Sequence, residues 1–123
     1  MLKLHLGCGT KRMEGYVNID IRPGDAVDVV SDLRELSFEK ESVDLIYSCC
    51  AIEHFSRKEW FDLLKKWTSF LKPGGKLYLS TNDFDAITSW YQKSRNLEQL
   101  LGLLIGGQKT LMITMGWCLI IPL

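Results

Sequence analysis

The sequence predicts an α/β fold: a Rossmann-like, mainly parallel sheet of about five strands with flanking helices. Two observations lead to this prediction. Short apolar segments alternate with an amphipathic helix and with polar or glycine-containing loops, which is the order expected of parallel strands joined by crossovers. The composition is that of a globular chain, since 46% of the 123 residues are hydrophobic and 24% are charged. A chain of this length fills one domain.

Four strands are expected in the first half of the chain. They are Leu2–Leu6, Tyr16–Ile21, Val27–Val30 and Val43–Ser48, and the last has the β-branched, apolar character of a buried parallel strand. Only the segment Thr10–Tyr16 separates the glycines that follow the first strand from the second strand. A parallel crossover normally takes about a dozen residues or more. The first connection is therefore unusually compact, or the first two strands are not parallel.

The clearest helix begins after Ser56, which forms a capping-box pattern with Glu59. One apolar stripe follows at helical spacing, made of Trp60, Leu63, Leu64, Trp67 and Leu71. Pro73-Gly74-Gly75 is expected to end the helix and to turn the chain into a fifth strand, Lys76–Ser80. A second long helix is expected over Ala86–Leu104, capped by Asp83 or Asp85.

The last fourteen residues differ from the rest. All fifteen basic and fifteen acidic residues lie within residues 1–109, and residues 110–123 (TLMITMGWCLIIPL) carry no charge. We therefore divide the chain into a domain over 1–109 and an atypical tail over 110–123. A membrane span is disfavoured because enough length would have to include Lys109 and several glycines. Two interpretations stay open: a buried final strand, or a tail foreign to the original fold, produced by truncation or a shifted reading frame.

Charge and cysteine usage narrow the class of protein. Basic and acidic residues balance, so no overall field favours nucleic acid or an anionic membrane, and neither is expected as a partner. Cys8 lies between glycines, Cys49 and Cys50 are adjacent, and Cys118 is isolated. This spacing contains no metal clip, so we expect no metal site. The start of the chain is too short and too soon interrupted to be a secretory signal, which favours a cytoplasmic protein with reduced thiols.

Polar and glycine residues follow the predicted strands in order. Ligands of open α/β sheets bind at the carboxyl ends of the strands, where this sequence has Gly7, Cys8, Gly9, Asp20, Asp32, Ser48, Cys49 and the pair Asn82-Asp83. Glycines let a ligand approach the backbone, and the carboxylate of Asp20 can accept hydrogen bonds from ribose hydroxyls. Asp32 can accept from the amine of an adenine on which Leu33 packs. The structural alternatives are a turn at Asp20 and a helix cap at Asp32.

Two phosphate-binding patterns are missing from the sequence. The dinucleotide pattern G-x-G-x-x-G would need a glycine where Arg12 stands, and Asp20 comes too soon after Gly7 for the acidic residue of that pattern. The pattern G-x-x-x-x-G-K-[ST] does not occur either. A nucleotide-binding oxidoreductase is therefore disfavoured.

The segments LHLGCG, NID, SDL, VDLIYSCCAIEHF and LKPGGKLYLS, in this order, resemble the motifs of class I S-adenosylmethionine-dependent methyltransferases. The resemblance extends to about residue 108 and is closest to small bacterial proteins, some linked to cell-surface sugar metabolism. It implies that Gly7, Cys8 and Gly9 pass the methionine part of the cofactor, that Asp20 binds the ribose, and that Ile21 lies beside the adenine. It likewise implies that Asp32 and Leu33 hold the adenine, and that Ser48 and Cys49 line the floor near the sulfonium.

The sequence departs from this family at two places. His5 replaces an acidic residue that is common two positions before the first glycine, which weakens the expected hold on the cofactor's amino group. Family members also continue past a segment like Gly106-Gly107-Gln108 into further strands, so we expect the fold to be incomplete at its C-terminal end.

The resemblance implies methyl transfer to a small-molecule acceptor, with S-adenosylhomocysteine as the product. A sugar or a cell-surface glycan precursor is one such acceptor. A hydroxyl acceptor needs a base: His54 is the first candidate because its ordinary pKa of about 6.5 suits proton transfer near neutrality, and Asp83 is the second. Glu53 is expected to serve only as an orienting partner. The structural alternatives are packing or capping beside the neighbouring helices. A truncated cofactor-binding module without turnover is the alternative function, and the oligomeric state is open.

Overall fold

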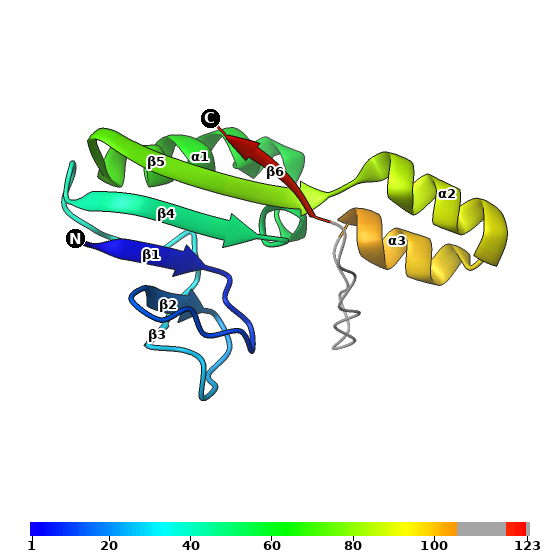
Figure 1. Ribbon diagram of the computed structural model, residues 1–123, viewed down its shortest axis with the longest axis horizontal. Coiled ribbons are helices and arrows are strands. Elements are labelled where there is room, and N and C mark those ends of the chain that lie inside the picture. Colours follow the sequence, from blue (N-terminus) through cyan, green and yellow to red (C-terminus); the bar gives the residue numbers. More distant parts are fainter. Residues whose placement is uncertain (106–117, 123) are drawn as a thin grey trace.

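The computed structural model describes residues 1–105 and 118–122, which form a six-stranded sheet in the order β3-β2-β1-β4-β5-β6 (Figure 1). The strands are β1 (Lys3–Leu6), β2 (Val17–Asp20), β3 (Val29–Val30), β4 (Val43–Cys49), β5 (Leu71–Asn82) and β6 (Cys118–Pro122). β1 to β5 pair in parallel, and β6 is antiparallel to β5. The predicted fold class and the mainly parallel sheet are confirmed.

β6 comes from the charge-free segment. The rest of residues 110–123, and the boundary we drew at residue 109, lie outside the described residues.

Three α-helices and one short 3₁₀ helix complete the described part of the chain. They are η1 (Ile52–His54), α1 (Arg57–Phe70), α2 (Phe84–Ser94) and α3 (Leu97–Ile105). α1 lies along one face of the sheet, whereas α2 and α3 form a hairpin beyond the carboxyl ends of β4 and β5 (Figure 1). Among the described residues, no helix combines the length and the apolar character needed to cross a bilayer.

α1 begins at the predicted capping box, where the Ser56 amide donates to Glu59 Oε2 at 2.9 Å. Its stripe packs on the sheet through Leu63 and Trp67, which are 4% and 0% exposed. A stripe at this spacing predicts that Trp60 is buried in the core, and this prediction is wrong. Trp60 is 38% exposed, and its indole N–H donates to the Phe55 carbonyl. Phe70 takes the place predicted for Leu71, because the helix ends at Phe70 and Leu71 already belongs to β5.

The first connection is compact, and the first pair of strands is nevertheless parallel: Leu4 faces Val17 and Leu6 faces Ile19 across β1 and β2. No helix forms between these two strands. The amides of Gly7 and Cys8 instead both donate to the Ile19 carbonyl, at 2.9 and 3.1 Å, and turn the chain back at once. A short loop thus connects the two parallel strands, where a crossover helix is usual.

Two later predictions need correction. Pro73-Gly74-Gly75 does not stand outside the sheet but forms an irregularity within β5, where the register with β4 shifts. The single helix expected over residues 86–104 is two helices. Arg95 has a φ of 55° and ends α2, and the Asn96 side chain accepts from the Gln99 amide and starts α3. Asp83 caps α2 as predicted, since it accepts from the Ala86 amide at 3.1 Å.

Candidate functional site

The carboxyl ends of β1, β2, β4 and β5 lie at the same edge of the sheet, because these strands are parallel and adjacent (Figure 1). Leu6 at the end of β1 pairs with Ile19 of β2 on one side and with Ser48 of β4 on the other. Cys49 in turn faces Ser80 of β5. The sequence-predicted residues Gly7, Asp20, Ser48 and Cys49 are thus brought to one edge.

The glycine loop needs glycine at its first position for two reasons. Gly7 has a φ of +71°, which side-chain-bearing residues rarely adopt. A Cβ added there would lie 2.7 Å from the Cβ of Ala51, which is itself buried after β4. The loop therefore passes in close contact with the segment that follows β4.

Asp20 joins the end of β2 to this loop. The residue is 6% exposed, its Oδ2 accepts from the Gly9 amide at 2.8 Å, and its Oδ1 accepts from the Arg22 amide at 3.0 Å. The Arg22 guanidinium lies 3.6 Å from the same Oδ1. An ionised carboxylate has about four acceptor positions, so these contacts leave capacity for further donors.

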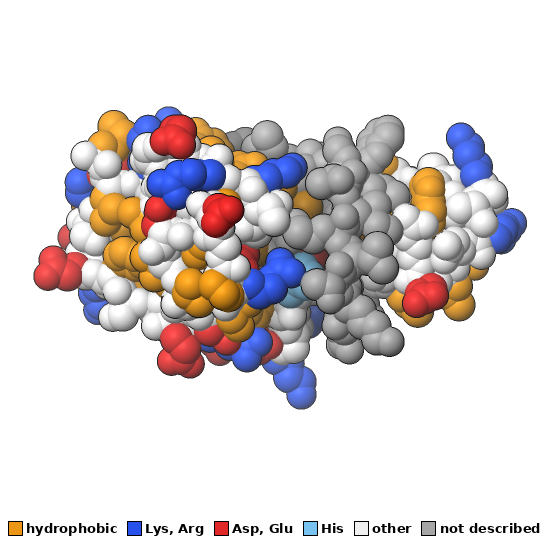
Figure 2. Space-filling model, turned by 90° about the horizontal axis from the view of Figure 1, so that it is seen from below, with side chains coloured by type: hydrophobic (Ala, Val, Ile, Leu, Met, Phe, Trp, Pro, Cys, Tyr) orange, Lys and Arg blue, Asp and Glu red, His pale blue; other side chains and the backbone are white. Residues whose placement is uncertain are grey.

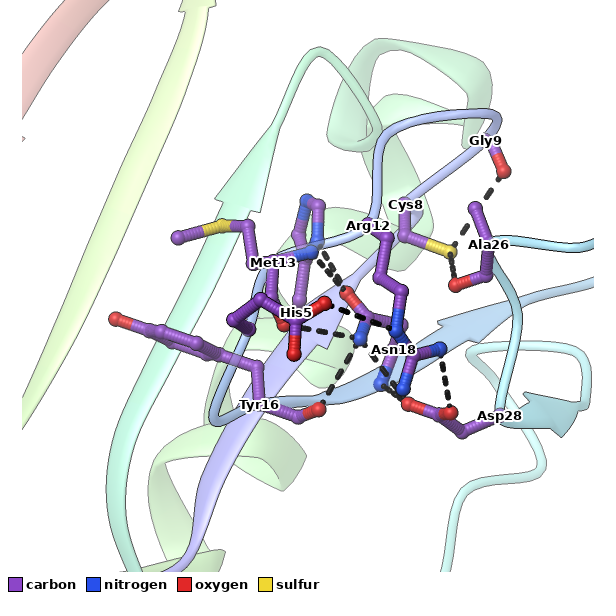
Figure 3. A network of polar contacts seen from close by, with 10 residues as sticks. His5, Cys8, Gly9, Arg12, Met13, Tyr16, Asn18, Ala26 and Asp28 are labelled. Carbon is purple, nitrogen blue, oxygen red and sulfur yellow. Dashed lines mark hydrogen bonds and ion pairs between the residues drawn. The ribbon is translucent and has the colours of Figure 1, made fainter.

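Asn18, which the sequence analysis did not single out, holds the rest of the loop (Figure 3). It is fully buried, and its Nδ2 donates to the carbonyls of Met13 and Tyr16 and to Asp28 Oδ2. Its Oδ1 accepts from the Met13 amide at 2.9 Å and lies 3.0 Å from His5 Nδ1. Because this oxygen can only accept, His5 carries its proton on Nδ1.

Two groups of this network have shifted pKa values. Burial lowers the pKa of His5, so the ring is neutral near pH 7. The Asn18 amide and the Arg12 guanidinium, whose nearest nitrogen lies 2.7 Å from Oδ1, together lower the pKa of Asp28 to about 2. His5, which stands where an acidic residue was expected, is thus a neutral, buried ring that holds the loop.

The residues expected around the adenine differ in how much of each side chain a ligand could contact. Ile21 is 61% exposed, next to Asp20. Asp32 Oδ1 accepts from the Arg34 amide at 2.9 Å, but no helix forms over residues 33–36, so Asp32 holds a turn and not the helix cap that we gave as its structural alternative. Leu33 is 6% exposed and belongs to the core, so little of its side chain remains for a ligand. Cys8 is also buried, and burial raises the pKa of its thiol.

Ser48 carries a polar atom that the described residues do not satisfy. The side chain is 0% exposed, and its Oγ has no hydrogen-bond partner among them. A buried hydroxyl without a partner costs about 1–3 kcal/mol. Such an atom at the carboxyl edge of a sheet fits a ligand that offers it a polar contact.

Glu53 is the acidic group that the sequence analysis gave only an orienting role. Its Oε2 lies 3.5 Å from Thr81 Oγ1, and its Oε1 accepts from Asn82 Nδ2 at 3.4 Å. Asn82 also donates to the carbonyl of Leu103 and so ties α3 to this edge. Burial raises the pKa of Glu53. Its place in η1, the first element after the end of β4, was the signal that could have identified it.

The two predicted bases lie next to this contact in the sequence, since His54 follows Glu53 and Asp83 follows Asn82. His54 is exposed at the end of η1. Asp83 is partly buried, and one of its oxygens caps α2. Within the described ranges, no cluster of three or more His, Cys, Asp or Glu side chains could hold a metal ion. Figure 2 shows acidic, basic and apolar side chains interspersed over the described part of one face.

The chain resembles known proteins at two levels. A family model described as a methyltransferase domain matches residues 4–79. Among solved structures, a protein of Pyrococcus horikoshii OT3 is 23% identical with a TM-score of 0.59, over 79% of this chain and 53% of that one. A chain from the complex of the Haloferax volcanii Trm112 methyltransferase activator with a methyltransferase is 20% identical with a TM-score of 0.54, over 75% and 50%. No curated protein matches.

At these identities the solved structures establish the fold alone. The chain spans about half the length of either one, 53% and 50%. The family match covers the strands and loops that carry Gly7, Asp20 and Ser48.

Proposed function

The chain belongs to the methyltransferase-domain family, and from this premise we propose that it transfers a methyl group from S-adenosylmethionine to a small-molecule acceptor. On the resemblance of the motifs, the proposal extends to sugars and cell-surface glycan precursors as the acceptor class. A cytoplasmic location is part of the proposal.

Asp20 is the observation that carries this proposal. A buried carboxylate at the end of the second strand holds the glycine loop and still has lone pairs to accept from two vicinal hydroxyls. Ser48 supports it independently, since its buried Oγ needs a partner. The backbone of Gly7, Cys8 and Gly9 would lie along the methionine part, and Cys49 beside the sulfonium. Ile21, Asp32 and Leu33 would border the adenine.

When bound, S-adenosylmethionine supplies an already activated methyl group, so this chain's own residues have mainly to position the reactants. Asp20 fixes the loop against which a ligand would rest. A hydroxyl acceptor also has to lose a proton, and we propose His54 as the group that accepts it, with Asp83 as the second choice. Glu53, adjacent to His54 in sequence and partly buried, would orient it and stabilise its charged form.

The test is a calorimetric titration of the 123-residue chain with S-adenosylhomocysteine. We expect binding by the native chain and a loss of about 1–3 kcal/mol in Asp20→Ala, because hydrogen bonds to a charged acceptor disappear. Arg22→Ala is the matched control, since it removes an exposed neighbour of the same carboxylate. No binding by the folded native chain would contradict the proposal, and an unchanged affinity in Asp20→Ala would remove Asp20 from the site.

A methyl-transfer assay with labelled cofactor separates the enzyme from its alternative. Turnover with a hydroxylated acceptor supports the enzyme. Binding of S-adenosylhomocysteine without turnover on any acceptor of this class would favour a cofactor-binding module.

A further inference from the structure

Two adjacent cysteines bring their sulfur atoms together at the carboxyl edge. Cys49 is the last residue of β4 and Cys50 the next, and their Sγ atoms are 3.7 Å apart. Successive side chains of a strand normally point to opposite faces. Cys50, however, has a φ of 52°, a left-handed conformation that non-glycine residues seldom adopt. This turn of the backbone places the second sulfur on the same side as the first.

The surroundings hold the pair in place and leave it accessible. The Cys50 amide donates to the Ser80 carbonyl at 2.9 Å, and Cys50 Sγ lies 4.0 Å from Asn82 Oδ1. Asn82 is itself fixed by Glu53 and by α3. Both cysteines are only partly buried, so a small reagent can reach them.

The sulfur spacing fits a bridging atom better than a direct bond. Adjacent Cα atoms are about 3.8 Å apart, below the roughly 4.4–6.8 Å usual for disulfides, so a bond between these two sulfurs is strained. The Sγ–Sγ distance of 3.7 Å is far longer than the roughly 2.05 Å of a disulfide bond. It leaves room for one atom that is bonded to both sulfurs. A soft centre that needs only two protein ligands therefore fits here.

We propose that Cys49 and Cys50 form a dithiol site for trivalent arsenicals of the arsenoxide class. The arsenic atom exchanges its oxygen for two thiolate sulfurs. Two As–S bonds form, the oxygen leaves as water with the two thiol protons, and no atom is oxidised or reduced. The second bond is intramolecular and is favoured by effective concentration. Soft thiolate ligands suit such a soft centre.

Occupation of this site would close the proposed cofactor site. Ser48 and Cys49 form the floor assigned to the sulfonium region, and an arsenic-bound group on Cys49 would occupy it. This consequence rests on the proposed function, whereas the dithiol site does not.

The test uses phenylarsine oxide with the complete chain and intact-mass detection. We expect one adduct that survives excess monothiol and is released by a 1,2-dithiol, with peptide mapping placing it on the segment that contains residues 49 and 50. Cys49→Ser and Cys50→Ser should each lose the monothiol-resistant adduct, and Cys50→Gly, which tolerates the left-handed backbone, should lose it too.

Two matched cysteine variants serve as controls. Cys8→Ser removes a buried thiol, and Cys118→Ser removes the cysteine whose backbone pairs with Asn82; both should keep the adduct. A native chain without the adduct, an adduct that survives in Cys50→Gly, or one that is lost in Cys118→Ser would overturn the assignment.

A separate binding measurement tests whether the arsenical closes the proposed cofactor site. The arsenical-bound chain should bind S-adenosylhomocysteine at least tenfold more weakly than the unmodified chain. Unchanged binding would refute the coupling while leaving the dithiol site intact. Failure of the unmodified chain to bind would count against the proposed function and not against the adduct.

Discussion

Replacing Gly7 by alanine should destabilise the fold more than the same change at Gly15, which lies in the same loop. Alanine at a φ of +71° costs about 1–2 kcal/mol for the left-handed backbone. Its Cβ would also meet the Ala51 Cβ at 2.7 Å, and overpacking of this kind costs about 1–3 kcal/mol. The expected loss in unfolding free energy is therefore about 2–5 kcal/mol.

Gly15→Ala is the matched control. Gly15 has a φ of +80°, but nothing lies within 4 Å of an added Cβ, so only the backbone cost of about 1–2 kcal/mol applies. The gain from a less flexible unfolded chain is the same in both variants and cancels. Urea unfolding should place the midpoint of Gly7→Ala below that of Gly15→Ala by about 1 M at equal slope. Equal midpoints would show that the contact with Ala51 is not tight and would refute the reasoning.

Three further predictions concern the buried groups of the site. Because burial lowers the pKa of His5 below its ordinary 6.5, the unfolded chain binds the proton first; stability is complete above pH 6.5 and falls as the pH drops toward the lowered value. Urea unfolding of the native chain between pH 7.5 and 5 should show this loss of unfolding free energy, and His5→Gln should show a smaller loss. The same pH dependence of stability in both chains would show that His5 is not its source. Ser48→Ala should leave stability unchanged or raise it by about 1 kcal/mol, because it removes an unsatisfied hydroxyl. The same variant should bind S-adenosylhomocysteine more weakly in calorimetry. A loss of stability in Ser48→Ala would instead show that the hydroxyl has a hydrogen-bond partner within the fold. If the ionised Glu53 carboxylate orients His54, turnover should rise as the pH rises through the raised pKa of Glu53. Glu53→Gln should lose this rise in turnover with pH and keep its affinity for the ligand. An unchanged pH–rate profile in Glu53→Gln, or full activity in His54→Ala, would contradict these roles.

The strands and the first helix were predictable because their signals are local. The alternation around Leu4, the β-branched run of β4 and the capping box at Ser56 each depend on residues near in sequence. The break between α2 and α3 was not, since Arg95 is an ordinary helix former and its left-handed conformation has no strong signal of its own.

The site was predictable in part, because it follows from the predicted strands. Parallel strands bring their carboxyl ends to one edge, so Asp20 and Ser48 follow from the order of the strands. The roles of Asn18 and Glu53 did not follow, because each depends on partners in other segments. Asn18 bonds a loop and Asp28, and Glu53 meets Thr81 and Asn82 from a neighbouring strand.

The missing crossover helix and the candidate site have a common explanation. Without a helix between β1 and β2, the loop is held by the Ile19 carbonyl at its start, by Asp20 at Gly9 and by the amide of Asn18 near Met13. These contacts are all made within the chain itself, so they lower the cost of ordering the loop on binding. The same contacts make the loop sensitive, since Asp20 both braces it and offers its remaining lone pairs to a ligand. Binding affinity and folding stability should therefore change together in variants of Asp20 and separately in variants of Ser48, which lies at the edge without bracing the loop.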